Sequence, residues 1–167
     1  MKKILILSFS EINRDPRVLR QINALYKTGY NLTVSGYCNG KPFKYPDIDF
    51  IKINKPEFTF FQKILLAIKL FLKLYDSYYF SRPEVVEARK KISEKKYDLI
   101  ISNDLSSLPL ASKLNSHKGI VFDAHEYSPL EFEDKLIWRI LFKEYSISML
   151  KKYKKFCVDM FTVSPGL

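Results

Sequence analysis

Apolar runs alternate with helix-like segments along this chain. Near-continuous apolar runs at 3–9, 97–104, 119–125 and 156–164 predict strands buried on both faces. NLTVSGY (31–37) and the alternating DFIKIN (49–54) predict two more strands. Helices are expected between them, so parallel pairing through right-handed crossovers follows. The pattern therefore predicts an α/β domain with a doubly wound, mainly parallel sheet and helices on both faces.

The starts and ends of several helices are marked by specific residues. Asp15 followed by Pro16 predicts a capped helix start, and Gly29 predicts its end, because glycine readily takes the left-handed cap conformation. Ser81 and Glu84 have capping-box spacing and predict a helix running to Lys96. Further helices are expected over 108–114 and 133–156.

The segment 58–80, FTFFQKILLAIKLFLKLYDSYYF, is expected to form one long helix that is apolar around most of its circumference. Such a helix either lies in a lipid interface, where lysines and tyrosines reach the headgroups, or packs on the sheet or a partner. Both alternatives stay open on the sequence. If the helix meets a membrane, the expected contacts are Lys63, Lys69, Phe71, Leu72 and Lys73.

Composition narrows the class of protein and its partners. The chain has 167 residues, is 47% hydrophobic, and carries a net charge of +10. It can therefore bury a core as one domain, and its charge favours an anionic partner such as a membrane surface, a phosphorylated substrate or nucleic acid. Cys38 and Cys157 are expected to be reduced core residues, which fits the cytoplasm. The apolar start is short and soon followed by charges, so it predicts a buried strand rather than a signal peptide.

Polar residues follow four of the predicted strands, where ligands bind in open α/β sheets. The first strand is followed by Ser10, Glu11, Asn13 and Arg14, and the last by VSPG. These and the polar residues after the strands at 97–104 and 119–125 are expected to form one rim. The candidate substrate-binding residues are Ser10, Glu11, Asn13, Arg14, Asn103, Asp104, Asp123 and Glu126.

His125 is the candidate catalytic residue. It ends a predicted strand between Asp123 and Glu126, whose carboxylates can orient its ring and raise its pKa. Such a histidine can donate to a sugar or phosphate, or act as an acid or base. Asp104 can equally cap the helix that follows it. No metal-ligand spacing, GxGxxG, P-loop or Gly-x-Ser-x-Gly is present, so neither a metal nor a complete dinucleotide site is expected.

Three motifs resemble the N-terminal domain of glycosyltransferase family 4. They are the segment KILILSFSEINRDPRVLRQINALYKTGYNLTVSGY, the segment YDLIISNDLSSLPLASKL, and GIVFDAHEYSP with a terminal DMFTVSPGL. The resemblance covers nearly the whole chain. In the family, the loop after the first strand usually has glycines near the donor phosphates, whereas this chain reads SFSEIN there.

The resemblance implies a Rossmann-like domain that forms the N-terminal, acceptor-side half of a GT-B fold, spanning 1–167. The half that binds the nucleotide-sugar and carries a Glu-x7-Glu pair would be absent, so the piece is expected to be inactive alone. The implied enzyme is a retaining hexosyltransferase that moves a sugar from a nucleotide-sugar to a glycan or lipid-linked acceptor in cell-surface polysaccharide synthesis. His125 would lie near the transferred sugar, and Asp104 and Glu126 would position the acceptor or loops.

The remaining expectations concern partners and place. The nucleotide-sugar is expected as co-substrate without a further cofactor, and an anionic membrane surface as a partner. The expected location is the cytoplasm, peripheral at the inner face of the plasma membrane. A non-catalytic GT-B-like subunit is an alternative that a transfer assay would separate. Nucleic-acid binding is the weaker alternative, because the aromatics form no basic groove signature, and no nucleic-acid partner is expected.

Overall fold

The computed structural model describes residues 2–40, 42–124 and 136–162. In these residues six strands form one parallel sheet in the order β3-β2-β1-β4-β5-β6. The strands are β1 (Lys3–Glu11), β2 (Asn31–Tyr37), β3 (Asp49–Ile53), β4 (Leu99–Asn103), β5 (Ile120–Ala124) and β6 (Cys157–Thr162). The doubly wound α/β prediction is confirmed, and β1, β4, β5 and β6 are consecutive neighbours, as the expected rim requires.

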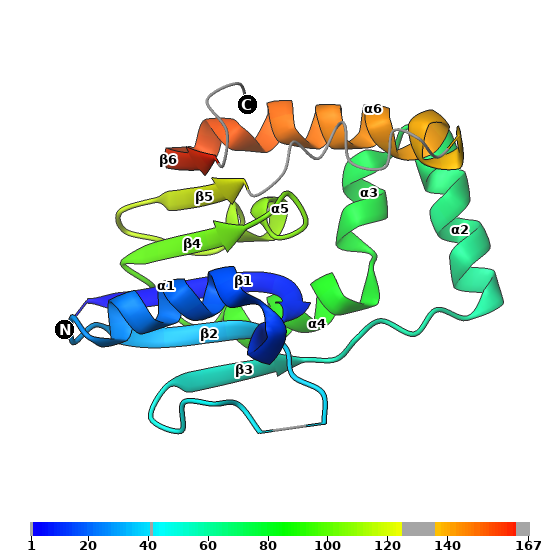
Figure 1. Cartoon of the computed structure of the whole chain (residues 1–167). Helices are drawn as coiled ribbons and strands as arrows, with labels where there is room; N and C mark the ends of the chain where they lie inside the picture. Colours follow the sequence, from blue (N-terminus) through cyan, green and yellow to red (C-terminus); the bar gives the residue numbers. More distant parts are fainter. Residues whose placement is uncertain (1, 41, 125–135, 163–167) are drawn as a thin grey trace.

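Helices cover both faces of the sheet (Figure 1). The helices are α1 (Pro16–Tyr26), α2 (Phe60–Phe71), α3 (Tyr75–Phe80), α4 (Pro83–Ile92), α5 (Leu108–Ala111) and α6 (Leu136–Tyr153). Short 3-10 turns at Ile12–Arg14 and Lys154–Phe156 precede α1 and β6. Helix α1 lies on one face, and α3, α4, α5 and α6 contribute to the core on the other.

The core has two halves because side chains of a strand alternate between faces. Ile4 and Ile6 of β1 pack with Val18 and Ile22 of α1 on one face. Leu5 and Leu7 point to the opposite face, where α3 to α6 pack. All of these side chains except Ile4 are fully buried. This explains why β1 has an unbroken apolar run: each of its faces meets a helix layer.

The predicted start of α1 is confirmed, and the helix ends at Tyr26, shortly before the predicted end at Gly29. The Asp15 carboxylate accepts hydrogen bonds from the backbone N–H groups of Arg17 at 3.1 Å and Val18 at 3.2 Å, which caps the helix. Gly29 has φ +74°, the left-handed conformation expected after a helix end. Cys38 and Cys157 are free cysteines, and Cys38 is buried.

The expectation of one helix over 58–80 is wrong. The segment forms α2 and α3, separated by a break at Lys73, whose φ is 56°. The break turns the chain so that Tyr79 is fully buried and its hydroxyl donates to the Ser106 carbonyl at 2.7 Å. The apolar pattern continues through the break because both helices carry apolar side chains, so periodicity alone does not reveal it.

The capping box expected at Ser81 and Glu84 is also wrong. Helix α4 begins at Pro83 with Arg82 in the cap position, and no side chain caps it. The Ser81 hydroxyl donates to the Tyr78 carbonyl at 3.1 Å instead. Glu84 is fully buried and forms an ion pair with Arg82. The buried glutamate therefore pairs with the half-buried arginine rather than reaching back to the helix start.

Candidate functional site

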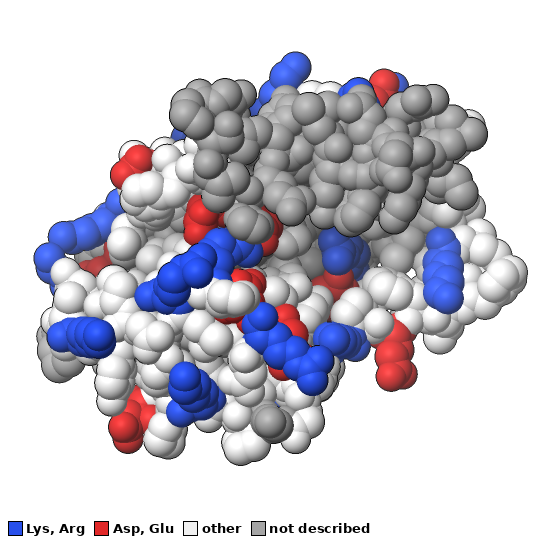
Figure 2. All heavy atoms as spheres, in the orientation of Figure 1, with Lys and Arg blue, Asp and Glu red and all other residues white. Residues whose placement is uncertain are grey.

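The rim lies at the carboxyl edge of the sheet, where β1, β4 and β5 end beside the start of α1. Figure 2, which looks onto the sheet face covered by α1, shows acidic and basic side chains next to one another near the middle of the view. Two clusters of hydrogen-bonded polar side chains lie at the rim. Arg17 organises the first, and Gln21 organises the second one helical turn further along α1.

Arg17 holds Asp104 in a two-pronged ion pair. Its Nη1 and Nη2 groups donate to the two carboxylate oxygens of Asp104 at 2.8 and 2.7 Å. Asp15 adds a second carboxylate 3.6 Å from Nη2. The Arg17 pKa is raised above its usual value, mainly by the hydrogen bonds to Asp104. The arginine is thus a permanent positive charge between two carboxylates.

Asp104 has an unusual backbone for a non-glycine residue. Its φ is 65°, in the left-handed region, and its N–H donates to the Asp123 carbonyl at 3.0 Å. This conformation costs about 1–2 kcal/mol for most L-residues and is more acceptable for aspartate. The alternative role of Asp104 as a cap is not observed: Ser107 takes the cap position of α5, and no side chain caps that helix. The backbone turn instead directs the carboxylate toward Arg17.

Gln21 joins the ends of β4 and β5. Its side-chain Nε2 donates to Asn103 Oδ1 at 2.9 Å and to Asp123 Oδ2 at 2.5 Å. Asn103, which is fully buried, returns a hydrogen bond from its Nδ2 to Gln21 Oε1 at 3.1 Å. Asn103 and Asp123 are also partners in the β4–β5 register. The second cluster therefore fixes the side chain that precedes Ala124, the last residue of β5.

The predicted site residues at and after the end of β1 have different surroundings: some lie at the rim, and others contact the loop after β2. The Ser10 hydroxyl accepts a hydrogen bond from Ser8 at 2.9 Å and bonds to Asp15. Glu11 accepts from the Asn39 backbone at 3.0 Å, and Asn13 donates to the Pro42 carbonyl at 3.0 Å. Glu11 and Asn13 thus contact the loop after β2, and Arg14 is exposed.

The structure therefore brings together part of the predicted set. Ser10, Asn103, Asp104 and Asp123 belong to the two clusters, and Glu11 and Asn13 lie against the loop after β2. His125 and Glu126 lie outside the described residues. Among the described residues, no group of three or more His, Cys, Asp and Glu side chains could hold a metal ion.

Arg17 and Gln21 were missed as site residues. They stand four positions apart on α1, so they project from the same side of the helix toward the rim. The sequence feature that could have identified them is their place directly before Val18 and Ile22, the buried residues of α1. Spacing shows that they share a direction, whereas their partners on β4 and β5 are set by tertiary structure.

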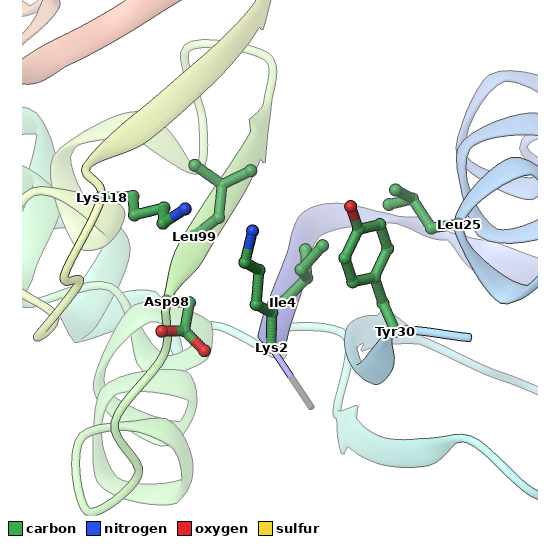
Figure 3. A pocket seen from close by; sticks show the side chains of 7 residues that line it. All are labelled: Lys2, Ile4, Leu25, Tyr30, Asp98, Leu99 and Lys118. Atoms are coloured by element: carbon green, nitrogen blue, oxygen red, sulfur yellow. The ribbon is translucent and has the colours of Figure 1, made fainter. Parts of the chain in front are cut away.

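A pocket lies at the opposite edge of the sheet, where the strands begin (Figure 3). Lys2 and Lys118 extend into it beside Tyr30. The nearby Lys2 ammonium lowers the pKa of Lys118, because two like charges disfavour each other. Asp98 accepts from the Lys3 backbone at 2.7 Å on the same edge. This pocket is separate from the rim and contains none of the predicted site residues.

Comparisons with known proteins support the fold. No protein-family model and no curated protein matches the sequence. The chain is similar in structure to sucrose-phosphate synthase from Thermosynechococcus elongatus, with a TM-score of 0.59 and 13% identity over 99% of this chain and 43% of that one. It is also similar to SsfS6, a glycosyltransferase from Streptomyces sp. SF2575, with a TM-score of 0.54 and 16% identity over 99% of this chain and 51% of that one.

A second structure of SsfS6, complexed with thymidine diphosphate, aligns with a TM-score of 0.52 and 16% identity over 97% of this chain and 48% of that one. This chain therefore spans about half the length of these neighbours or less. Identities this low show the fold alone. With its six parallel strands and helices on both faces, the chain has a glycosyltransferase-like, Rossmann-like fold.

Proposed function

We propose that this chain is the N-terminal, acceptor-side domain of a retaining hexosyltransferase of glycosyltransferase family 4. It would act with a C-terminal domain that binds most of the nucleotide-sugar. The acceptor would be a glycan or a lipid-linked sugar in cell-surface polysaccharide synthesis. The observation that carries the proposal is a glycosyltransferase-like fold whose carboxyl edge bears fixed polar groups from β1, β4 and β5.

The first cluster has the properties of a binding group for sugar hydroxyls. Asp104 is 37% exposed although both of its carboxylate oxygens bind Arg17. A carboxylate has about four acceptor sites, so Asp104 can accept from a hydroxyl without losing Arg17. Arg17 holds this carboxylate in one orientation before a substrate arrives, which lowers the ordering cost of binding.

The second cluster would prepare the position of His125. Gln21 holds Asp123, and the carbonyl of Asp123 holds the Asp104 backbone. The end of β5, which precedes His125, is thereby hydrogen-bonded to both β4 and α1. His125 is proposed to contact the transferred sugar, and Glu126 to position the acceptor. The reaction would need no metal and no cofactor beyond the nucleotide-sugar. SsfS6 has been solved with thymidine diphosphate, which supports a nucleotide donor for this fold.

The proposed location is the cytoplasm, peripheral at the inner face of the plasma membrane. Within the described residues, no helix is long and apolar enough to cross a membrane. The net charge of +10 favours an anionic leaflet, where each nearby Lys or Arg contributes about 1 kcal/mol.

A transfer assay on the complete protein tests the proposal. The assay presents a panel of nucleotide-sugars with membrane-derived acceptors and measures nucleotide release and labelled product. His125→Ala is expected to lower kcat at least about a hundredfold, the usual contribution of a positioned acid or base. His117→Ala is the matched control, because His117 lines a pocket with Tyr97 away from the rim, and it should keep wild-type turnover. Absence of transfer with every donor would favour a non-catalytic subunit.

A further inference from the structure

Helix α2 exposes an apolar face of unusual size. Its side chains Phe60 and Phe71 are 80% and 78% exposed. At 3.6 residues per turn, the exposed apolar side chains fall within an arc of roughly 140°. They are Phe60, Phe61, Ile64, Leu65, Ile68, Phe71 and Leu72, called here the α2 face. Contiguous apolar patches of this kind mark sites that contact a protein or a membrane.

The α2 face is not the side by which the helix packs on its own domain. Leu70 is 5% exposed and belongs to the buried core. It lies roughly on the opposite side of the helix from the centre of the α2 face. Helix α2 is in contact with α3 and α6. The helix therefore has an inner apolar side that anchors it and an outer apolar side that is left for another occupant.

The charges around the α2 face identify that occupant. Helix α2 contains no acidic residue, and Lys63 and Lys69 lie beyond the two borders of the arc. Lys63 is exposed and can place its stem along the apolar surface and its ammonium group among anionic headgroups, whereas the Lys69 ammonium is bonded to Ser81 of its own domain. A second copy of this chain would bring like charges to the contact, since the net charge is +10. The charge pattern favours anionic lipid over a second copy.

Other polar contacts keep the helix in place without covering the α2 face. Lys69 Nζ donates to Ser81 Oγ at 2.9 Å, and Lys73 pairs with Glu144 at 2.7 Å. Both contacts link α2, or the break after it, to neighbouring elements. A Thr59–Gln62 capping box closes the amino end of the helix. These contacts fix the direction of α2 relative to the core.

Helix α2 also lies at the same end of the molecule as the rim. Figure 1 shows it beyond the carboxyl ends of the strands. Its 12 residues span about 18 Å, too short for the ~30 Å hydrocarbon core. The helix can therefore lie in the headgroup plane but cannot cross the bilayer.

We propose that the α2 face docks in the interface of an anionic bilayer and turns the rim toward substrates held at that surface. The docking stands on the structure alone, and the orientation of substrates rests on the function proposed above. Vesicle binding needs no sugar donor, so it can succeed where transfer fails. If the protein binds vesicles but transfers no sugar, the proposed function is refuted and the proposed docking surface is supported.

Co-sedimentation of the complete protein with vesicles tests the docking. Vesicles of phosphatidylcholine alone are compared with vesicles that also contain phosphatidylglycerol, an anionic lipid that gives the surface a negative potential. Binding is expected to the anionic vesicles, and it should weaken as salt rises because the charge attraction is screened. Phe71→Ser with Leu72→Ser should weaken binding at least about tenfold, since two large apolar side chains leave the interface.

Val86→Ser is the matched control, because Val86 is an exposed apolar residue of α4, away from α2. It should bind vesicles as the wild type does, and circular dichroism should show that all variants fold. The proposal is overturned if anionic vesicles do not bind at low salt or if the double variant binds as well as wild type. A dimer in sedimentation that the double variant dissociates would assign the α2 face to a second copy. Strong hydrogen-exchange protection of α2 without vesicles would assign it to another segment of the complete protein.

Discussion

Removing the Arg17 guanidinium should destabilise the domain by a measurable and limited amount. Arg17→Met keeps the apolar stem but deletes two charged hydrogen bonds to Asp104, at 2.8 and 2.7 Å. Each such bond contributes about 1.5–3 kcal/mol when shielded from water. Asp104 is 37% exposed, so solvent screens the pair and rehydrates the carboxylate after the substitution. We therefore expect the free energy of unfolding to fall by about 2 kcal/mol in total.

Urea denaturation followed by circular dichroism measures this change. Arg17→Lys should lose about half as much stability, because an ammonium keeps the charge but not the two-pronged geometry. Arg20→Met is the control: Arg20 is on the same helix and exposed, so its loss should cost less than about 0.5 kcal/mol. A stability of Arg17→Met equal to that of wild type would refute the view that this ion pair fixes the rim.

The backbone of Asp104 gives an independent check. Both Asp104→Ala and Asp104→Gly remove the carboxylate, but only glycine takes a φ of 65° without strain. Glycine should therefore be the more stable replacement by about 1 kcal/mol. The order would be reversed if the carboxylate alone determined stability, since glycine also gives the unfolded chain more freedom.

Two further changes test other parts of the fold. Burial raises the Asp15 pKa, but hydrogen bonds from Ser10 and the Val18 N–H and the charge of Arg17 outweigh it, so the folded pKa lies below the usual 3.8. The ionised carboxylate thus stabilises the fold above that pH, and this stability is lost as pH falls through the folded pKa. The advantage of wild type over Asp15→Asn, which keeps a cap acceptor, should shrink in urea titrations from pH 7 to pH 3; a constant difference would contradict this. Gly36→Ala should lower the free energy of unfolding by about 1–3 kcal/mol, because its Cβ would lie 2.5 Å from Ile12 Cδ1 and 2.8 Å from the Ser8 carbonyl. A melting temperature unchanged from wild type would show that β1 and β2 can move apart there.

The order of elements was predictable because burial in this fold has a simple linear signature. A strand covered on both faces needs an unbroken apolar run, which 3–9 provides, and Asp15 and Gly29 mark the ends of α1 through local backbone chemistry. The break at Lys73 has no such local signature. Lysine is not a residue that favours positive φ, and the conformation is imposed by the burial of Tyr79 and its bond to Ser106.

The candidate site was predictable to the level of the strand ends and no further. That Asn103, Asp104 and Asp123 share an edge follows from parallel pairing. The hydrogen bonds from Arg17 and Gln21 to these residues do not follow from strand pairing, because they join residues 82 to 102 positions apart. The Glu84 error has the same origin. Its spacing from Ser81 suits a cap, but the fold buries it against Arg82.

The central claim is that this chain is the acceptor-side half of a sugar transferase and that another domain binds the donor. Calorimetric titration of UDP-, GDP- and TDP-sugars into the complete protein, and separately into residues 1–167, tests this division directly. We predict that the complete protein binds at least one of these donors. The 167-residue chain should bind none of them tightly, since the rim offers fixed carboxylates and amides but no glycine-rich phosphate loop. Tight donor binding by the 167-residue chain alone would contradict the account.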